Sequence, residues 1–122
     1  MAQALEANGA KVYIIGRRKD KLDEAAATAL YGNIFPLQCD VTTKSSLQSV
    51  ATHIAAVTGY VNLVIANSGI QGPNYNELLP DKDRKIHNRQ EVHRALWGPS
   101  MEQLAEGYKV NVIGVYYTAI AF

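Results

Sequence analysis

The sequence predicts an α/β fold, a partial doubly wound parallel sheet with helices on its faces. Short apolar runs alternate with longer segments of helical periodicity over the first half of the chain, and such alternation is typical of parallel β-α units. Residues 61–66 are apolar at nearly every position, as expected for a strand buried on both faces. We therefore expect three strands, at residues 12–15, 34–39 and 61–66, in one domain that covers residues 1–122.

The composition excludes several classes of partner. The 122 residues are 48% hydrophobic and 19% charged, with a formal net charge of +1, so we expect no general attraction to nucleic acid or to a membrane surface. The longest apolar stretch, residues 110–122, is shorter than the roughly 20 residues of a membrane-spanning helix. No histidine has the spacing of a metal site. The single cysteine, Cys39, fits a reducing compartment, and with no signal peptide expected the prediction is a cytoplasmic protein.

Two helices are expected around the first strand. Residues 2–8 are expected to end a helix, because Ala2, Leu5 and Glu6 are good helix formers and Gly9 suits the left-handed conformation that closes a helix. Residues 19–30 are expected to form the next helix. One face of it is apolar: Leu22, Ala25, Ala26, Ala29 and Leu30. The strand at residues 34–39 contains Pro36, whose missing N–H suits an edge strand.

A further helix is expected between Thr42 and Gly59. Thr42 or Thr43 can cap its first turn, and Gly59 can end it. Apolar residues recur along it at three- and four-residue steps, so one face should be buried. These residues are Leu47, Val50, Ile54 and Val57.

The regular alternation is lost between residues 70 and 99. This region is polar and contains three prolines, and only residues 89–97 show a helical pattern. A segment this long between elements is usually functional or mobile. From Ser100 a long helix is expected, since Ser100 and Gln103 have the spacing of a capping box.

Polar residues follow each of the three predicted strands. The stretches are "GRR" at residues 16–18, "CDVT" at residues 39–42 and "ANSG" at residues 66–69. Each alone is an ordinary turn sequence. In open α/β sheets, however, ligands bind at the carboxyl ends of the strands. Three such stretches in order therefore predict a ligand site at this edge.

Taken in order, these stretches resemble the short-chain dehydrogenases/reductases that use a nicotinamide cofactor, and the resemblance covers nearly the whole chain. "CDVT" resembles the Asp-Val motif of that family. "ANSG" resembles its Asn-Asn-Ala-Gly motif, although Ala66 replaces the first Asn and Ser68 replaces Ala. "KVNVIGVYYT", residues 109–118, resembles its fourth long helix. The resemblance implies a Rossmann-type sheet and an oxidoreductase acting on a small carbonyl or alcohol.

The resemblance also implies roles for particular residues. Asp40 would accept a hydrogen bond from the adenine amino group, and Val41 would pack on the adenine ring. Asn67, Ser68 and Gly69 would contact the cofactor. Asn111 matches the structural and proton-relay asparagine of the catalytic tetrad. Because the last helix helps form the dimer interface in this family, Tyr116, Tyr117 and Phe122 are expected to pack against a partner.

The two arginines after the first predicted strand indicate which nicotinamide cofactor is preferred. Family members that use NAD have an acidic residue at the end of the second strand of the fold, where this chain has Gly16. Gly16 leaves room and offers no carboxylate to repel a phosphate. Arg17 follows, and its planar donors suit the 2′-phosphate of NADP. We therefore expect Arg17, helped by Arg18, to select NADP(H) over NAD.

Several parts of the family pattern are missing from these 122 residues. There is no glycine-rich turn for a pyrophosphate, and none of the seven tyrosines has a lysine four residues later. In the strand order 3-2-1-4 of this fold, the strand between those at residues 12–15 and 61–66 is also missing. We therefore expect a slot in the sheet, a chain that is inactive and poorly stable alone, and a protein truncated at both ends relative to its family.

Two other readings stay open. In the first, the chain is a non-catalytic truncated product that binds a partner through its last helix. In the second, it is a receiver-like domain with Asp40 as the phosphate acceptor. The second reading requires an acidic pair after an N-terminal strand, and residues 1–18 contain only Glu6.

Overall fold

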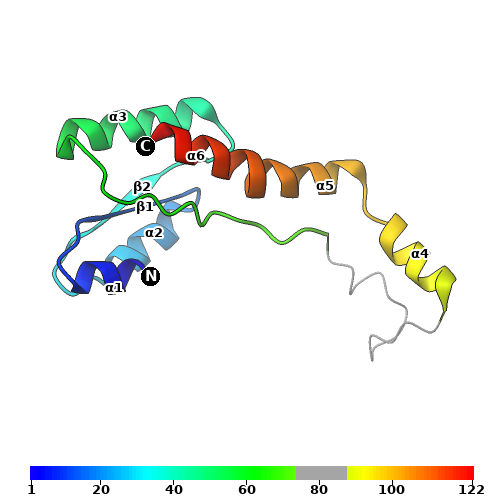
Figure 1. Ribbon diagram of the computed structural model, residues 1–122. Helices are drawn as coiled ribbons and strands as arrows, with labels where there is room; N and C mark the ends of the chain where they lie inside the picture. The colour runs from blue at the N-terminus through cyan, green and yellow to red at the C-terminus, as the bar shows by residue number, and fades with distance from the viewer. Residues whose placement is uncertain (74–87) are drawn as a thin grey trace.

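The computed structural model describes residues 1–73 and 88–122 (Figure 1). Part of the irregular region between residues 70 and 99 therefore lies outside the described residues. Six α-helices, one π-helical stretch and two strands are present in the described ranges. In chain order they are α1 (Ala2–Ala7), β1 (Val12–Gly16), α2 (Lys19–Ala26), β2 (Ile34–Gln38), α3 (Lys44–Thr58), α4 (Arg89–Trp97), α5 (Met101–Tyr108), η2 (Lys109–Gly114) and α6 (Val115–Ala121).

The strands β1 and β2 form a parallel pair that runs from Val12 opposite Ile34 to Gly16 opposite Gln38. The Asn33 carbonyl accepts from the N–H of Val12 at 2.8 Å, and the Cys39 N–H donates to the carbonyl of Gly16 at 2.8 Å. Parallel pairing in this order confirms the predicted α/β class. Since β2 is an edge strand, the expected place for a proline in this sheet is also confirmed.

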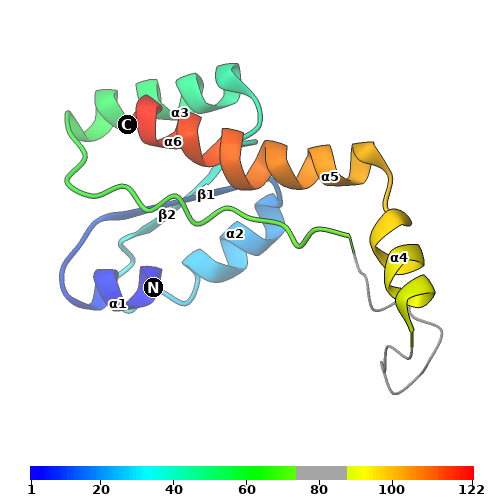
Figure 2. The ribbon, with the colours of Figure 1, turned by 45° about the vertical axis from the view of Figure 1, so that its right-hand side comes forward.

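Helices cover both faces of this small sheet. In Figures 1 and 2, α1 and α2 lie on one face, and α3 and α6 lie on the other. Because side chains alternate along a strand, Tyr13 and Ile15 of β1 face the α3–α6 layer, where they pack against the buried core. The predicted doubly wound layering is therefore present around β1 and β2.

The third predicted strand is wrong as a hydrogen-bonded strand. In the described part of the chain the sheet has two strands, and residues 61–66 are extended without pairing. Leu63 is 61% exposed and Ile65 is 44% exposed. The physical reason is the absence of a neighbour, because a ladder needs backbone groups on an adjacent strand and a groove separates this segment from β1.

The helix α2 ends at Ala26, four residues earlier than the sequence pattern predicts. The carboxylate of Glu6 accepts hydrogen bonds from the backbone N–H groups of Leu30 at 3.0 Å, Tyr31 at 2.6 Å and Asn33 at 3.4 Å. These N–H groups are therefore not available to a longer helix. Leu30, expected on the buried face, is 68% exposed.

Glu6 is buried among these donors, with 1% of its surface exposed. Desolvation alone would raise the pKa of Glu6, but the three backbone hydrogen bonds outweigh it and lower the pKa below its ordinary value. Gly9, with φ of 90°, has the left-handed conformation expected after α1. The carboxylate thus ties α1 to the turn that precedes β2.

The core lies between the sheet and the α3–α6 layer. Leu47, Val50 and Ile54 of α3 are buried as predicted, but Val57 is 52% exposed. Gly59 ends the helix in the left-handed conformation. Thr43 occupies the N-cap position without a side-chain hydrogen bond. The buried cluster is completed by Cys39, Val41 and Val110.

The last helix begins as predicted. Ser100 and Gln103 form the capping box, and helical residues continue through α5, η2 and α6 to Ala121. Tyr117 and Phe122 pack on this chain's own core, whereas Tyr116 is 60% exposed.

The helix expected at residues 89–97 is present as α4. Asn88 caps it by accepting a hydrogen bond from the N–H of Glu91 at 3.0 Å. No helix in the described ranges has both the length and the apolar character to cross a bilayer.

Candidate cofactor site

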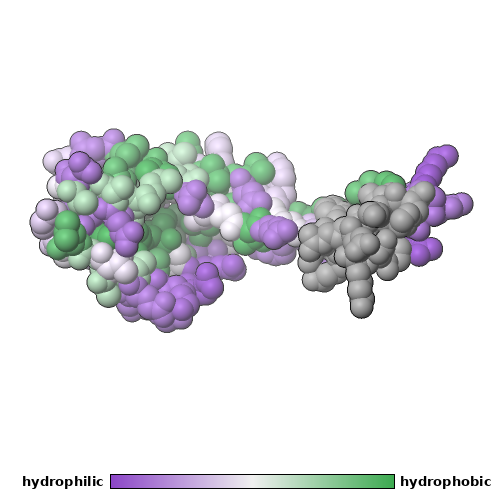
Figure 3. Space-filling view, turned by 90° about the horizontal axis from the view of Figure 1, so that it is seen from below, coloured by the Kyte–Doolittle hydropathy of each residue, from purple (hydrophilic) through white to green (hydrophobic). Residues whose placement is uncertain are grey.

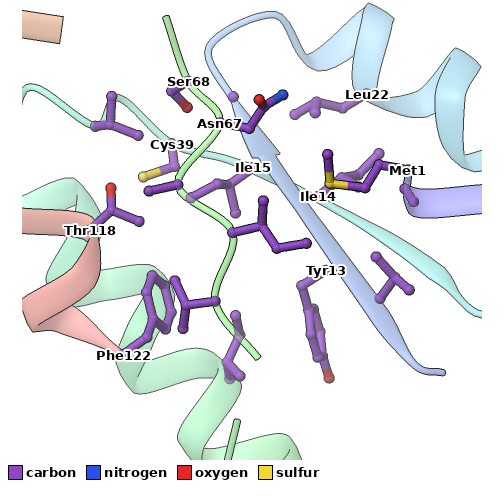
Figure 4. A pocket seen from close by; sticks show the side chains of 18 of the residues that line it. Met1, Tyr13, Ile14, Ile15, Leu22, Cys39, Asn67, Ser68, Thr118 and Phe122 are labelled. Carbon is purple, nitrogen blue, oxygen red and sulfur yellow. The ribbon is translucent and has the colours of Figure 1, made fainter. Parts of the chain in front are cut away.

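One groove is lined by the residues that follow the three predicted strands. Its volume is about 1280 Å³. One wall is β1, and the other is the extended segment 60–70 (Figure 4). All seven residues predicted to contact a cofactor line it: Arg17, Arg18, Asp40, Val41, Asn67, Ser68 and Gly69. Segments up to 52 positions apart in sequence thus meet at one edge of the sheet.

The arginines stand where β1 ends. Both side chains are exposed, and the backbone carbonyl of Arg17 accepts a hydrogen bond from Nε2 of Gln38 at 2.9 Å. This bond fixes the exit of β1 against the end of β2. Neither arginine forms an ion pair with another described residue, so both guanidinium groups can bind an anion in the groove.

At Gly16 no protein neighbour is close enough to require a glycine. A Cβ added there would meet its nearest neighbour, Cδ2 of Leu22, at 3.5 Å, an ordinary contact distance. A Cβ therefore fits among the protein atoms at this position. What Gly16 provides is the absence of a carboxylate beside Arg17.

The carboxylate of Asp40 is held in a turn. Its Oδ1 accepts from the N–H of Thr42 at 2.9 Å and from the Thr42 hydroxyl at 2.7 Å. The backbone N–H of Asp40 donates to the hydroxyl of Ser46 at 3.0 Å. These bonds hold the carboxylate in place at the groove.

The surroundings of Asp40 keep it ionised. The two hydrogen bonds from Thr42 have the largest effect and lower the pKa of Asp40, desolvation opposes them, and the positive charges of Arg17 and Lys109 lower the pKa by smaller amounts. At neutral pH this carboxylate is therefore an acceptor of hydrogen bonds. A ligand group that meets it must be a donor.

Val41 lies in the core as well as at the groove, with only 7% of its surface exposed. The last helix approaches it closely, because a Cβ added to Gly114 would lie 3.0 Å from Cγ2 of Val41. Only glycine permits this approach without a shift. The contact between Val41 and Gly114 thus positions the backbone at Val41 against η2.

Asn111 links the last helix to the segment that contains residues 66–70. Its Oδ1 accepts from the N–H of Ile70 at 2.9 Å, and its Nδ2 donates to the carbonyl of Ile70 at 2.9 Å. Gly69 fits beside this amide, since an added Cβ would lie 3.4 Å from Oδ1. Asn67, Ser68 and Gly69 are therefore held at the groove by a side chain 41 positions away from Ile70.

Three contributors to this site were not identified from the sequence. Ser46 supports the Asp40 turn and gave no signal beyond an ordinary helix residue. The π-helical stretch Lys109–Gly114 surrounds Asn111, and π-turns within helices often occur at functional sites. Gly114 did carry a signal, because a glycine inside a helical pattern often marks close packing.

The comparisons with known proteins identify the family. The family model described as short chain dehydrogenase matches residues 1–120. The chain belongs to the short-chain dehydrogenase family. This agrees with the resemblance that the polar stretches suggested.

Relatives of this short-chain dehydrogenase chain are longer proteins. The short-chain dehydrogenase/reductase PhomF of Diaporthe leptostromiformis is 43% identical over 123 residues, which are 100% of this chain and 40% of that protein. The chain therefore spans about two fifths of the length of this curated relative.

Solved structures show the same fold. An alcohol dehydrogenase from the archaeon Thermococcus sibiricus, complexed with 5-hydroxy-NADP, superposes with a TM-score of 0.72 and 23% identity over 99% of this chain and 44% of its own. An actinorhodin polyketide ketoreductase with NADPH gives a TM-score of 0.77 and 16% identity over 98% of this chain and 39% of its own. At these identities the likeness establishes the fold.

Proposed function

We propose that residues 1–122 form part of the dinucleotide-binding domain of an NADP(H)-dependent oxidoreductase. The reaction would transfer hydride between the nicotinamide and a small carbonyl or alcohol substrate. The observation that carries the proposal is the pair of exposed arginines directly after Gly16, in the same groove as the ionised Asp40. The arginines offer positive charge for the 2′-phosphate of the cofactor, and the nearby Asp40 carboxylate offers an acceptor for the amino group of its adenine.

Arg17 is the proposed selector of the 2′-phosphate. Arginine binds phosphate through paired N–H donors, and NADP-binding sites of this fold use an arginine where NAD-binding sites use an acid. Gly16 places no negative charge in front of it. Arg18, the N-cap residue of α2, adds a second positive charge at the same strand end.

Asp40 and Val41 are proposed to hold the adenine. The ionised carboxylate of Asp40 can accept a hydrogen bond from the adenine amino group, and its turn fixes the direction of that bond. Val41 supplies apolar surface where it lines the groove. Asn67, Ser68 and Gly69 are proposed to contact the cofactor along the opposite wall.

Asn111 is proposed to act in two ways. Its amide holds the Ile70 backbone and so positions the residues before it. By its place in the family pattern it would also support a proton relay in the complete active site. The nicotinamide, when bound, supplies the hydride chemistry.

The segment alone is proposed to be inactive. The family's acid/base tyrosine is followed four residues later by lysine, and no tyrosine in these 122 residues has that neighbour. Activity would require further sequence. The buried free Cys39 fits the proposed cytoplasmic location.

A homo-oligomer through the last helix is a further part of this proposal. Five apolar residues at four-residue spacing are substantially exposed along this helix. They are Leu104, Tyr108, Val112, Tyr116 and Ile120. Such a stripe on one helical face is suited to packing against another helix.

The cofactor preference can be tested without catalysis. Calorimetric titration should show that the chain binds adenosine 2′,5′-bisphosphate more tightly than adenosine 5′-monophosphate. Arg17→Ala should weaken the bisphosphate about tenfold or more, because it removes a charge-assisted hydrogen bond, and should leave the monophosphate almost unchanged.

Arg94→Ala is the matched control. Arg94 is an exposed arginine of α4 that does not line the groove, so this variant removes the same charge elsewhere and should bind as the parent does. Equal affinity of the parent chain for both nucleotides would contradict the proposed NADP preference.

A further inference from the structure

The groove that contains the candidate site is lined mainly by apolar residues. Figure 3 shows hydrophobic residues gathered over the middle of the folded body, between hydrophilic surfaces. In a mostly apolar site, a small number of placed polar groups decides which ligand binds. The Asp40 carboxylate is one of these groups, so whatever fixes its position bears on the choice of base.

The two oxygens of the Asp40 carboxylate are used differently. Both hydrogen bonds from Thr42, at 2.9 Å from its N–H and at 2.7 Å from its hydroxyl, go to Oδ1. Within the ranges that the structure describes, no residue donates a hydrogen bond to Oδ2. Because each oxygen of a carboxylate can accept, Oδ2 is the atom available to an incoming N–H donor.

The turn that holds this carboxylate is closed by bonds within itself. Besides the bonds from Thr42, the N–H of Thr43 donates to the Asp40 carbonyl at 3.1 Å. These bonds join residues close in sequence, so they fix the shape of the turn but not its place relative to the sheet. Asp40 also lies beyond the strand pair, since the ladder bond nearest to it runs from the N–H of Cys39 to the carbonyl of Gly16.

Ser46 connects this turn to the packed core. Its hydroxyl oxygen accepts a hydrogen bond from the N–H of Asp40 at 3.0 Å. Ser46 belongs to α3, and the next residue, Leu47, is 2% exposed in the core, so the acceptor cannot move without disturbing packed side chains. Because a partly buried N–H without an acceptor is costly, this bond holds the Asp40 backbone against α3.

The Ser46 hydroxyl is itself oriented. It donates its proton to Sγ of Cys39, over an oxygen–sulfur distance of 3.5 Å, and so presents a lone pair to the Asp40 N–H. Cys39 belongs to the buried cluster of the core. Ser46 does not line the groove, so an effect of this side chain on a bound base passes through Asp40.

We propose that Ser46 is a positioning residue for base selection, an inference that rests on the proposed adenine site. Through the Asp40 N–H, the Ser46 hydroxyl sets the place at which Oδ2 of Asp40 meets the exocyclic group of the base. A 6-aminopurine donates a hydrogen bond there, whereas a 6-oxopurine presents a carbonyl oxygen to a negative charge. Ser46 thus contributes to the selection of adenine over hypoxanthine without touching either base.

Paired nucleotide affinities test this role. Calorimetric titration compares adenosine 2′,5′-bisphosphate with inosine 2′,5′-bisphosphate, which carries oxygen in place of the amino group. The parent chain should bind the adenosine compound about tenfold more tightly, the size expected of one hydrogen bond to a charged group. Ser46→Ala should lower this ratio about threefold by weakening the adenosine compound, and should leave the inosine compound almost unchanged, since the displaced Asp40 still carries its charge.

Three further variants make the result specific. Ser46→Thr keeps a hydroxyl and should keep the ratio of the parent chain. Ser45→Ala removes an exposed serine one position earlier in α3 and should change neither affinity. In an Asp40→Ala background the acceptor for the amino group is gone, so Ser46→Ala should leave the ratio unchanged if the two residues act as one unit.

The outcomes separate this inference from the proposed function. A Ser46→Ala variant with the parent's ratio would overturn the inference alone. Equal weakening of both nucleotides would also overturn it, because it would show a general structural role; alanine is a better helix former than serine, so the variant should fold. Equal binding of the two nucleotides by the parent chain, or no binding of either, would contradict the adenine role of Asp40 and with it the role of Ser46.

Discussion

The two edges of β1 belong to the same five residues, but among the described residues only one edge is paired with another strand. On one side, β2 forms a regular parallel ladder over five residue pairs. On the other side, the segment 61–66 is extended and separated from β1 by the groove. Sequence propensity does not explain this difference, because β2 contains Pro36 whereas the segment 61–66 is nearly all apolar.

The comparison shows that strand formation here depends on a neighbour. The proline in β2 is tolerated because its missing N–H lies at position 36, whose backbone groups face the outer edge in the observed register. The segment 61–66 has suitable side chains but, among the residues that the structure describes, no adjacent backbone to pair with. Local preference is a weak guide to β structure where tertiary context decides.

The largest expected effect is a difference in side-chain burial between the packed core and the open side of β1. Leu47→Ala removes a side chain that is 2% exposed and should lower the free energy of unfolding by about 2–5 kcal/mol. Leu63→Ala removes one that is 61% exposed and should change it by less than about 0.5 kcal/mol. Urea denaturation of both variants measures the difference. Equal losses for the two variants would show that the open side of β1 is already packed.

A smaller effect is expected where α1 is attached to the paired side. Because the folded-state pKa of Glu6 is lowered from its ordinary value of 4.5, its contribution to stability is present above that value. The contribution is lost as the pH falls through the folded-state pKa. The urea midpoint should therefore fall in acid, and Glu6→Gln should lower it at pH 7 while reducing its dependence on pH.

Glu24→Gln is the control for that prediction. Glu24 forms an exposed ion pair with Lys21, and such pairs contribute little to stability. Its pH profile should follow the parent chain. A Glu6→Gln variant with the parent's acid sensitivity would contradict the role assigned to the Glu6 carboxylate.

Much of the fold could be predicted because its signals are local. Gly9 and Gly59 close their helices in the left-handed conformation, and the pair Ser100–Gln103 starts α5. These features depend on neighbouring residues alone. The early end of α2 could not be predicted, because the acceptor for Leu30, Tyr31 and Asn33 is Glu6, 24 positions or more away.

In the candidate site too, local sequence signals were predictable and long-range contacts were not. The polar stretches after the strands are visible in the sequence, and the topology of a parallel sheet brings them to one groove. The bond between Asn111 and the Ile70 backbone could not be seen, because it spans 41 positions and no periodicity connects its ends. The contact of Gly114 with Val41 likewise required the helix to be placed on the sheet.

The central claim is that three separate segments, those that follow β1, β2 and residues 61–66, form one cofactor site. Titration of the nitrogen-15-labelled chain with adenosine 2′,5′-bisphosphate tests it most directly. The account predicts that the amide signals of Arg17 and Arg18, of Thr42, and of Asn67 to Gly69 shift together with one dissociation constant. Shifts confined to the arginines, with no response after β2 or after the segment 61–66, would contradict it.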